Sequence, residues 1–362
     1  MPKVISVGEA IPDCRITQEE TMEFARQLFS ESFQDIERLL KVFHNGQIES
    51  RYFVKELDWF REDHTFAEKN DAFLEAAVKL GTESIENCLS SPHLGRAVEA
   101  EEIDAIFTIC TSGLATPSLE ARIMNILPFS KRTKRIPIWG LGCAGGASGL
   151  SRAYEYCRAF PEAKVLVMAV ELCSLTFQKD DVSKSNLIGT SLFADGAACA
   201  LIAGDSADRT LLQDKAYPSI LGTQSALMED SLDVMGWDIK DNGLYVVFSK
   251  SIPSLVEQWL KPNVEEFLEE HGLTGSEISH FIAHPGGKKV IQAYERALDL
   301  KPGLTDESLD VLRRHGNMSS ATVLYVLRRF LEKEIRAGEF GLVAALGPGF
   351  SSELLLARWE SC

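Results

Sequence analysis

The chain has 362 residues, of which 45% are hydrophobic and 25% charged, a balance typical of globular proteins. Its formal net charge of −16 argues against general nucleic-acid binding, because such binding needs a broad basic surface. No apolar run approaches the length of a membrane span, the N-terminus lacks the apolar core of a signal peptide, and the eight cysteines form no C-x-x-C pair. We therefore expect a reduced, cytoplasmic protein without a zinc site or a disulfide framework.

The first half of the chain alternates short apolar runs with amphipathic stretches. Residues 102–109, 136–139 and 165–170 have the pattern of strands, and residues 150–160 have that of a helix. Between the second strand and this helix, the run G-L-G-C-A-G-G-A-S-G-L puts Cys143 at or near a helix N-terminus, among glycine and alanine. Because unpaired N–H groups at a helix start favour negative charge, we expect Cys143 to lose its proton easily. The alternative is an inert cysteine that fills a tight packing site.

Three further stretches carry distinctive side chains at the ends of predicted elements. In L-F-A-D-G-A-A, Phe193 precedes an Asp-Gly pair, starting at Asp195, which we expect to form a turn; alone, Phe193 is most simply a core residue. In A-H-P-G-G, His284 ends a short apolar strand and precedes a loop. In R-H-G-N-M-S-S-A-T, Asn317 stands just before a helical pattern over residues 319–335, a position where asparagine is a favoured N-cap.

Weak self-similarity runs through the chain at a nearly constant offset. Three pairs of segments match in order: 102–109 with 277–284 (277 − 102 = 175), 142–150 with 316–324 (316 − 142 = 174), and 165–170 with 341–346 (341 − 165 = 176). A duplicated strand–loop–helix–strand unit predicts an α/β fold with two halves, residues 1–213 and 214–362. The repeat aligns Cys143 with Asn317, and it brings the loops of Cys143, His284 and Asn317 to related ends of the halves.

A cysteine, a histidine and an asparagine that meet define a specific chemistry. An imidazolium near Cys143 would hold it as a thiolate and let it attack a thioester. The imidazole of His284 and the amide of Asn317 can both donate hydrogen bonds to the oxygen that becomes negative when a malonyl group loses carbon dioxide. Because decarboxylation itself generates the carbanion, this step needs no general base, unlike the chemistry of a protease-like triad.

These residues resemble those of the type III polyketide synthases, the chalcone synthase-like enzymes of the thiolase superfamily. The resemblance spans nearly the whole chain and rests on G-L-G-C-A-G-G, L-F-A-D-G-A-A, I-A-H-P-G-G, H-G-N-M-S-S-A-T and G-P-G-F, with spacings of 284 − 143 = 141 and 317 − 284 = 33. Within the family, T-K-R-I-P-I-W-G-L-G-C-A-G-G-A-S-G-L is similar to the Bacillus-type enzymes that make alkylpyrones from long acyl starters.

The resemblance implies a homodimer with the five-layered αβαβα thiolase fold, built from two duplicated halves. It implies that Cys143 carries the growing chain as a thioester, while His284 and Asn317 activate it and drive malonyl-CoA decarboxylation. The enzyme would be an acyltransferase that loads a long-chain acyl-CoA, extends it with malonyl-CoA and releases tri- or tetraketide alkylpyrones or resorcinol-like products. Neither a cofactor nor a metal is implied.

Further pocket positions follow from the resemblance. Phe193 matches the gatekeeping phenylalanine between the coenzyme A tunnel and the reaction cavity, and Thr111 and Thr176 match pocket-lining positions. Val246 and Thr116 fall where plant relatives have a second gatekeeping phenylalanine and a methionine that crosses the dimer interface. Both side chains are smaller here, which favours a longer acyl chain.

Three cations are candidates for binding coenzyme A phosphates. Arg38 and Lys41 lie three residues apart on a predicted helix over residues 34–43, at or near positions where relatives bind these phosphates. Lys289, after H-P-G-G, would add positive charge at the tunnel mouth. The alternative for all three is a solvated surface cation.

Two other functions stay open from the sequence. A ketoacyl-ACP synthase III-like enzyme of fatty-acid synthesis shares the Cys-His-Asn chemistry, but its acidic carrier-protein partner requires a basic docking patch, which the charge of −16 disfavours. A non-catalytic thiolase-fold acyl-binding subunit would lack a catalytic residue, whereas all three are present.

Overall fold

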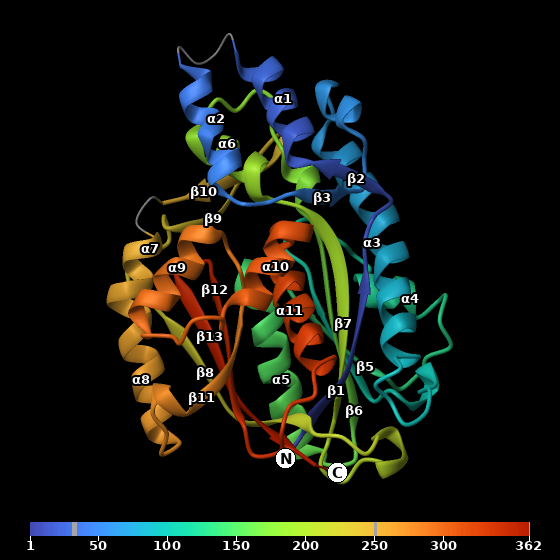
Figure 1. Ribbon diagram of the computed structural model, residues 1–362. Helices are drawn as coiled ribbons and strands as arrows, with labels where there is room; N and C mark the ends of the chain where they lie inside the picture. Colours follow the sequence, from blue (N-terminus) through green and yellow to red (C-terminus); the bar gives the residue numbers. More distant parts are fainter. Residues whose placement is uncertain (31–34, 250–251, 362) are drawn as a thin grey trace.

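Two α/β halves with matching topology make up the chain (Figure 1), in a computed structural model that describes residues 1–30, 35–249 and 252–361. The first half has the strand order β5-β4-β6-β7-β1 and the second β11-β12-β13-β8, and the sheets join where Lys3 of β1 pairs with Ser219 of β8. The strands of the two sheets are β1 (Lys3–Ala10), β4 (Ala105–Ile109), β5 (Lys134–Ile138), β6 (Lys164–Leu172), β7 (Asp195–Ala203), β8 (Tyr217–Leu227), β11 (Ile278–Ala283), β12 (Phe340–Gly347) and β13 (Ser351–Glu360).

Helices form three layers around these sheets. The outer helix of the first sheet is α3 (Phe66–Leu89), and α8 (Lys261–Glu270) and α9 (Lys288–Ala297) cover the outer face of the second. Between the sheets, α5 (Gly145–Ala159) and α11 (Thr322–Leu331) contact strands of both halves. The five-layered αβαβα architecture is thus confirmed.

The alternation along β12 shows how one strand serves two layers. Leu342, Ala344 and Leu346 belong to the core cluster that contains α8 and α9. Val343 and Ala345, between them, belong to the cluster that contains α5 and α11. Because successive side chains of a strand point to opposite faces, a nearly continuous apolar run is what a sheet covered on both faces requires.

The internal repeat is confirmed by the order and pairing of the elements. The series β1-α3-β4-α5-β6-β7 corresponds to β8-α8-β11-α11-β12-β13. In both halves the pair after the first crossover is parallel (β4 with β6, β11 with β12) and the next is antiparallel (β6 with β7, β12 with β13). The three matching segments fall on β4 and β11, on the starts of α5 and α11, and on β6 and β12. The predicted division at residues 213 and 214 lies between β7 and β8 and stays a prediction.

Smaller elements cover one end of the two sheets, at the top of Figure 1. Two small antiparallel sheets lie there: β2 (Cys14–Thr17) with β3 (Ser50–Phe53), which α1 and α2 connect, and the hairpin of β9 (Met235–Lys240) with β10 (Gly243–Phe248). The remaining helices are α1 (Gln18–Phe29), α2 (Ile36–Asn45), α4 (Leu119–Ile123), α6 (Lys184–Leu192), α7 (Ile252–Leu255) and α10 (Asp306–His315). Among the described residues, no helix combines the length and the apolarity needed to cross a bilayer.

Two local predictions are wrong. The helix expected over residues 319–335 begins as a tight turn, Ser319–Ala321, and α11 ends at Leu331, where the N–H of Glu332 bonds back to Arg328 before the chain turns into β12. The Asp-Gly pair at Asp195 forms no turn. It begins β7, because the chain has already left α6 in extended form and pairs at once with the end of β6.

Candidate active site

Cys143 lies in a tight turn, Gly142–Ala144, directly before α5, which confirms its predicted position near a helix start. The glycines around it permit a close approach of the two central helices. A Cβ on Gly146 would lie 2.2 Å from the carbonyl oxygen of Ser320, and one on Gly145 would lie 2.5 Å from Ile109 Cγ2. The starts of α5 and α11 can therefore meet backbone to backbone, which a side chain would prevent.

This approach joins residues from the two halves. The Cys143 Sγ lies 3.9 Å from the Asn317 side-chain oxygen Oδ1, which also accepts a hydrogen bond from the Ser319 N–H at 2.8 Å. The amide nitrogen of Asn317 donates to the carbonyl of Gly286 at 3.2 Å, two residues after His284. His284 itself follows the last residue of β11, as predicted. The asparagine thus links the cysteine turn to the histidine loop.

Burial dominates the electrostatics of both Cys143 and His284. Burial raises the pKa of the Cys143 thiol to about 12, while its hydrogen bonds with the Ser319 and Asn317 side chains act in the opposite direction. Burial also lowers the pKa of His284 to about 3, and neither ring nitrogen of His284 has a hydrogen-bond partner among the described residues. The expectation that the helix start alone makes Cys143 easy to ionise is therefore wrong.

A buried carboxylate, Glu171, organises the loops behind the cysteine. Its Oε2 accepts from the backbone N–H groups of Thr111 and Ser112, both at 3.0 Å, and its Oε1 accepts from the Ser320 hydroxyl at 2.5 Å. Burial raises the pKa of Glu171. Thr111 thus binds this carboxylate through its backbone N–H. It is not among the residues that line the pocket of Phe193, which is described next. The sequence offered no signal for Glu171, which sits in an apolar strand.

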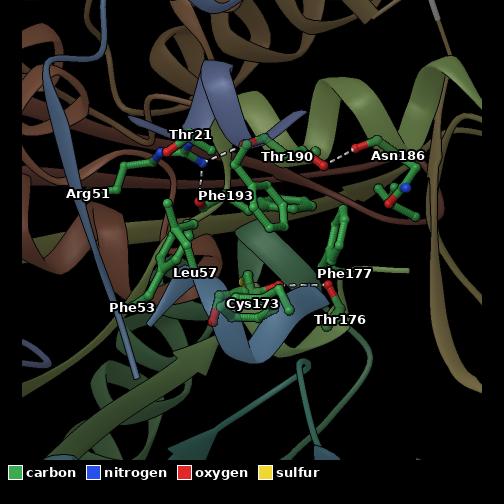
Figure 2. A pocket seen from close by; sticks show the side chains of 15 residues that line it. Thr21, Arg51, Phe53, Leu57, Cys173, Thr176, Phe177, Asn186, Thr190 and Phe193 are labelled. Carbon is green, nitrogen blue, oxygen red and sulfur yellow. Dashed lines mark hydrogen bonds between the residues drawn. The ribbon is translucent and has the colours of Figure 1, made fainter. Parts of the chain in front are cut away.

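Phe193, Thr176 and Val246 line one pocket of about 40 Å³ (Figure 2). The Thr176 hydroxyl donates to the Cys173 carbonyl at 2.7 Å, and the Phe193 ring lies 5.5 Å from the ring of Phe248 on β10. Four more phenylalanines line the pocket, Phe24, Phe53, Phe60 and Phe177, together with polar side chains that include Thr21, Arg51 and Asn186. The Phe193 backbone also forms a bridge with Asn317, so the pocket wall adjoins the cysteine site.

The remaining predicted site residues lie on the surface. Thr116 is exposed beside a cis peptide bond to Pro117 and is not among the residues that line this pocket within one chain. Its predicted role depends on a second chain and stays a prediction. The loop after β4 carries it outward. Arg38 and Lys41 are exposed on α2, and Lys289 is exposed at the start of α9.

The C-terminal end of α2 and the N-terminal end of α9 come together around Leu192. One methyl of Leu192 lies 3.9 Å from the Cβ position of Gly46, which follows α2. The side chain also lies 3.8 Å from the Cβ position of Gly287, which precedes α9. Lys289 thus stands at the end of α9 that takes part in this contact, whereas Arg38 lies in the first turn of α2, at the opposite end of that helix. The role of the three cations in binding stays a prediction. In the described part of the chain, no cluster of three or more histidine, cysteine, aspartate or glutamate side chains could hold a metal ion.

The fold and the joined cysteine, histidine and asparagine loops define a thiolase-like acyltransferase. Two family models, for the N-terminal and C-terminal domains of the chalcone and stilbene synthases, match residues 1–206 and 220–359. The chain belongs to this family, that of the type III polyketide synthases.

Individual relatives are similar to this chain over almost its full length. The chain is 54% identical to a Bacillus subtilis (strain 168) protein named "Putative chalcone synthase", over 99% of both chains. It is 34% identical to the 1,3,6,8-tetrahydroxynaphthalene synthase of Streptomyces peucetius subsp. caesius, over 98% of this chain and 93% of that one. The crystal structure of the corresponding Streptomyces coelicolor A3(2) enzyme, a bacterial type III polyketide synthase, matches with a TM-score of 0.91 at 29% identity, covering 99% of this chain and 100% of that one. These matches do not favour the carrier-protein-dependent synthase or the non-catalytic subunit.

Proposed function

We propose that this type III polyketide synthase loads an acyl group from coenzyme A onto Cys143 and extends it with malonyl-CoA. The observation that carries the proposal is the 3.9 Å contact between Cys143 Sγ and the Asn317 side chain, whose amide is held on the loop of His284. All three residues are buried, and in this proposal Cys143 is the nucleophile, His284 the proton acceptor and Asn317 the amide donor.

Loading begins with a proton transfer. The neutral imidazole of His284 takes the proton of Cys143 as its sulfur attacks the carbonyl carbon of the acyl-CoA. A bond forms between this carbon and the cysteine sulfur, and the bond to the sulfur of coenzyme A breaks. The proton passes from His284 to the departing thiolate, so free coenzyme A leaves and the acyl enzyme remains.

Extension uses His284 and Asn317 as hydrogen-bond donors. Both donate to the thioester oxygen of malonyl-CoA, Asn317 through the amide N–H that does not bind Gly286. When the bond to the carboxylate breaks, carbon dioxide leaves and its electron pair remains as an enolate, whose oxygen the two donors stabilise. The enolate carbon attacks the thioester on Cys143, and the cysteine sulfur leaves. The electron pair comes from decarboxylation, so the step needs neither a cofactor nor a metal.

The starter in this proposal is a long-chain acyl group. The phenylalanines that line the pocket beside Phe193 favour an apolar starter over a polar one, and Val246 leaves more room than a phenylalanine would. The cavity of about 40 Å³ must open further to take a long chain. We propose alkylpyrones or resorcinol-like compounds as products. A relative from Mycobacterium tuberculosis, 28% identical over 98% of this chain, is named for alpha-pyrone synthesis, which supports the pyrone.

Coenzyme A binding is proposed at the exposed cations Arg38, Lys41 and Lys289. Guanidinium and ammonium groups suit phosphate recognition, and the N-terminus of α9 beside Lys289 adds partial positive charge. The convergence of α2 and α9 on Leu192 supports a shared mouth between them. The seven described cysteines are free, which fits the reducing cytoplasm that we propose for the enzyme.

A homodimer completes the proposal. The strand β5 ends its sheet, and exposed apolar side chains follow the neighbouring strand ends, including Leu114 (42% exposed) and Trp139 (47% exposed). An exposed strand edge with apolar neighbours suits pairing with a second copy. Thr116 lies in the same loop as Leu114, so in the dimer it could reach the partner, as its family position implies. A single-chain mass by light scattering would contradict the dimer.

The decisive experiment is incubation of the chain with acyl-CoAs of increasing length plus malonyl-CoA, with products identified by mass spectrometry. We expect extension of long-chain starters, and we expect Phe193→Ala to change product length more than acyl loading. Phe160→Ala, at an exposed ring outside the pocket, is the matched control. Extension from carrier-protein-bound malonate alone, with none from malonyl-CoA, would refute the proposal.

A further inference from the structure

Arg51, on β3, is the one lysine or arginine of the described chain that is completely buried. Its Nη1 donates to the carbonyls of Thr190 and Phe193, each at 2.7 Å, as Figure 2 shows. These carbonyls stand at the C-terminal end of α6, where no further helical N–H can bond to them. A cation at a helix C-terminus also interacts favourably with the helix dipole. The guanidinium therefore fixes the point where α6 ends and the Phe193 backbone begins.

The same segment is joined directly to Asn317. The Asn317 N–H donates to the carbonyl of Leu192 at 2.8 Å, and the N–H of Ala194 donates to the carbonyl of Asn317 at 2.9 Å. Phe193, between these two bonds, is thus held by Arg51 on one side and by the asparagine on the other. A displacement of this carbonyl moves the asparagine backbone with it.

The stem of Arg51 supports Asn317 from a second direction. Gly316 has a φ of +73°, and a Cβ there would lie 2.7 Å from Arg51 Cγ and 2.8 Å from Cδ. The arginine methylenes therefore fill the space that any other residue at position 316 would need. This close contact fixes the backbone immediately before Asn317.

The burial of Arg51 without a full set of hydrogen bonds lowers the stability of the fold, which argues against a purely structural role. Its Nε and Nη2 have no hydrogen-bond partner in the described chain, and unpaired buried donors destabilise a fold. Asp195, also fully buried, provides an opposite charge nearby and is itself held by the Ser174 N–H at 2.7 Å and the Val54 N–H at 2.9 Å. Incompletely satisfied polar groups of this kind are concentrated at functional sites.

We infer that Arg51 is a positioning residue that sets the backbone of Phe193 and Asn317, and through them both enolate formation and the boundary of the acyl pocket. This inference rests on the proposed roles of those two residues. It predicts that loss of Arg51 separates the half-reactions: acyl loading depends on Cys143 and His284, whereas malonyl-CoA decarboxylation also depends on where Asn317 stands.

The test compares Arg51→Met, Arg51→Lys and, as the matched control, Arg15→Met, at an exposed arginine on the paired strand β2. Loading is read as acyl-enzyme mass and decarboxylation as carbon dioxide release from malonyl-CoA. In R51M we expect loading within about twofold of wild type, decarboxylation down about tenfold, and a changed ratio of short to long products. R51K, which keeps a charged donor, should recover part of both effects, and R15M should behave as wild type.

Equal loss of both half-reactions with an unchanged product ratio, or an R51K no better than R51M, would overturn the inference. If R51M fails to fold, R51K decides: a lowered ratio of decarboxylation to loading supports the inference, and a wild-type ratio overturns it. Wild-type enzyme run in parallel separates the two proposals, because an absence of decarboxylation there would refute the proposed function instead.

Discussion

Replacing His284 by alanine removes the proposed proton acceptor of the buried Cys143 thiol. Burial raises the pKa of this thiol to about 12, against 9.0 for an unperturbed cysteine. Without a partner, the thiolate fraction at about pH 7.5 is roughly 10^(7.5 − 12), or about three in 100,000, whereas an unperturbed thiol is about three per cent ionised. We therefore expect Cys143 in H284A to be alkylated about a thousandfold more slowly than an unperturbed thiol, and much more slowly than in the wild type.

The assay is alkylation by iodoacetamide followed by peptide mass spectrometry, with the partly exposed Cys14 as an internal reference. Between about pH 7 and 10, the rate at Cys143 in H284A should rise about tenfold per pH unit without a plateau. His280→Ala is the control, because His280 lies on β11, the strand that directly precedes His284, and its ring pairs with Glu339. Equal rates at Cys143 in wild type and H284A at neutral pH would refute His284 as the proton acceptor.

Three further predictions test other parts of the structure. Asn317→Ala should keep acyl loading and lose malonyl-CoA decarboxylation, measured as carbon dioxide release; equal loss of both steps would contradict its role as enolate donor. Burial raises the pKa of Glu9 from 4.5 to about 7, so the folded state disfavours the carboxylate and stability falls as pH rises through that window. The difference between the melting temperatures of E9Q and wild type should thus increase in favour of E9Q from pH 4.5 to about pH 7 and stay constant above it. A difference that does not change with pH would disprove this. Gly8→Ala puts a Cβ 2.2 Å from the backbone nitrogen of Cys88 and should lower the melting temperature by roughly 4 °C or more, whereas Gly275→Ala meets open space and should change little.

Features set by local pattern and duplication could be predicted from the sequence. The apolar runs gave the matching strands, because a sheet covered on both faces needs continuous hydrophobicity. The constant offset between the halves aligned Cys143 with Asn317, and the structure brings these two within 3.9 Å. His284 was found by its position at a strand end before a proline-glycine loop, and such loops gather at one edge of related sheets.

Features set by long-range packing could not be predicted. Arg51 stands in the strand S-R-Y-F, where a charged residue indicates an exposed position, yet it is buried under the end of α6 by contacts 139 and 142 residues away in sequence. The prediction that Cys143 ionises easily failed for a related reason. The helix start, which lowers the pKa of a thiol, was visible in the sequence, but the burial that raises this pKa was not. Thr116 was assigned to a pocket because it aligns with a residue that crosses the dimer interface in relatives. One chain alone does not show that pocket.

The glycines around Cys143 explain why the site needs both halves. Gly146 lies where a side chain would collide with the backbone of Ser320, so the start of α5 can approach the start of α11 only if that position lacks a Cβ. This contact, and not a local motif, sets the separation between the cysteine of one half and the asparagine of the other. A substitution at Gly146 should therefore act as a catalytic defect in decarboxylation before it acts on loading, because it pushes Asn317 away while Cys143 stays on its own helix. Equal effects on both half-reactions would show that the glycines serve packing alone.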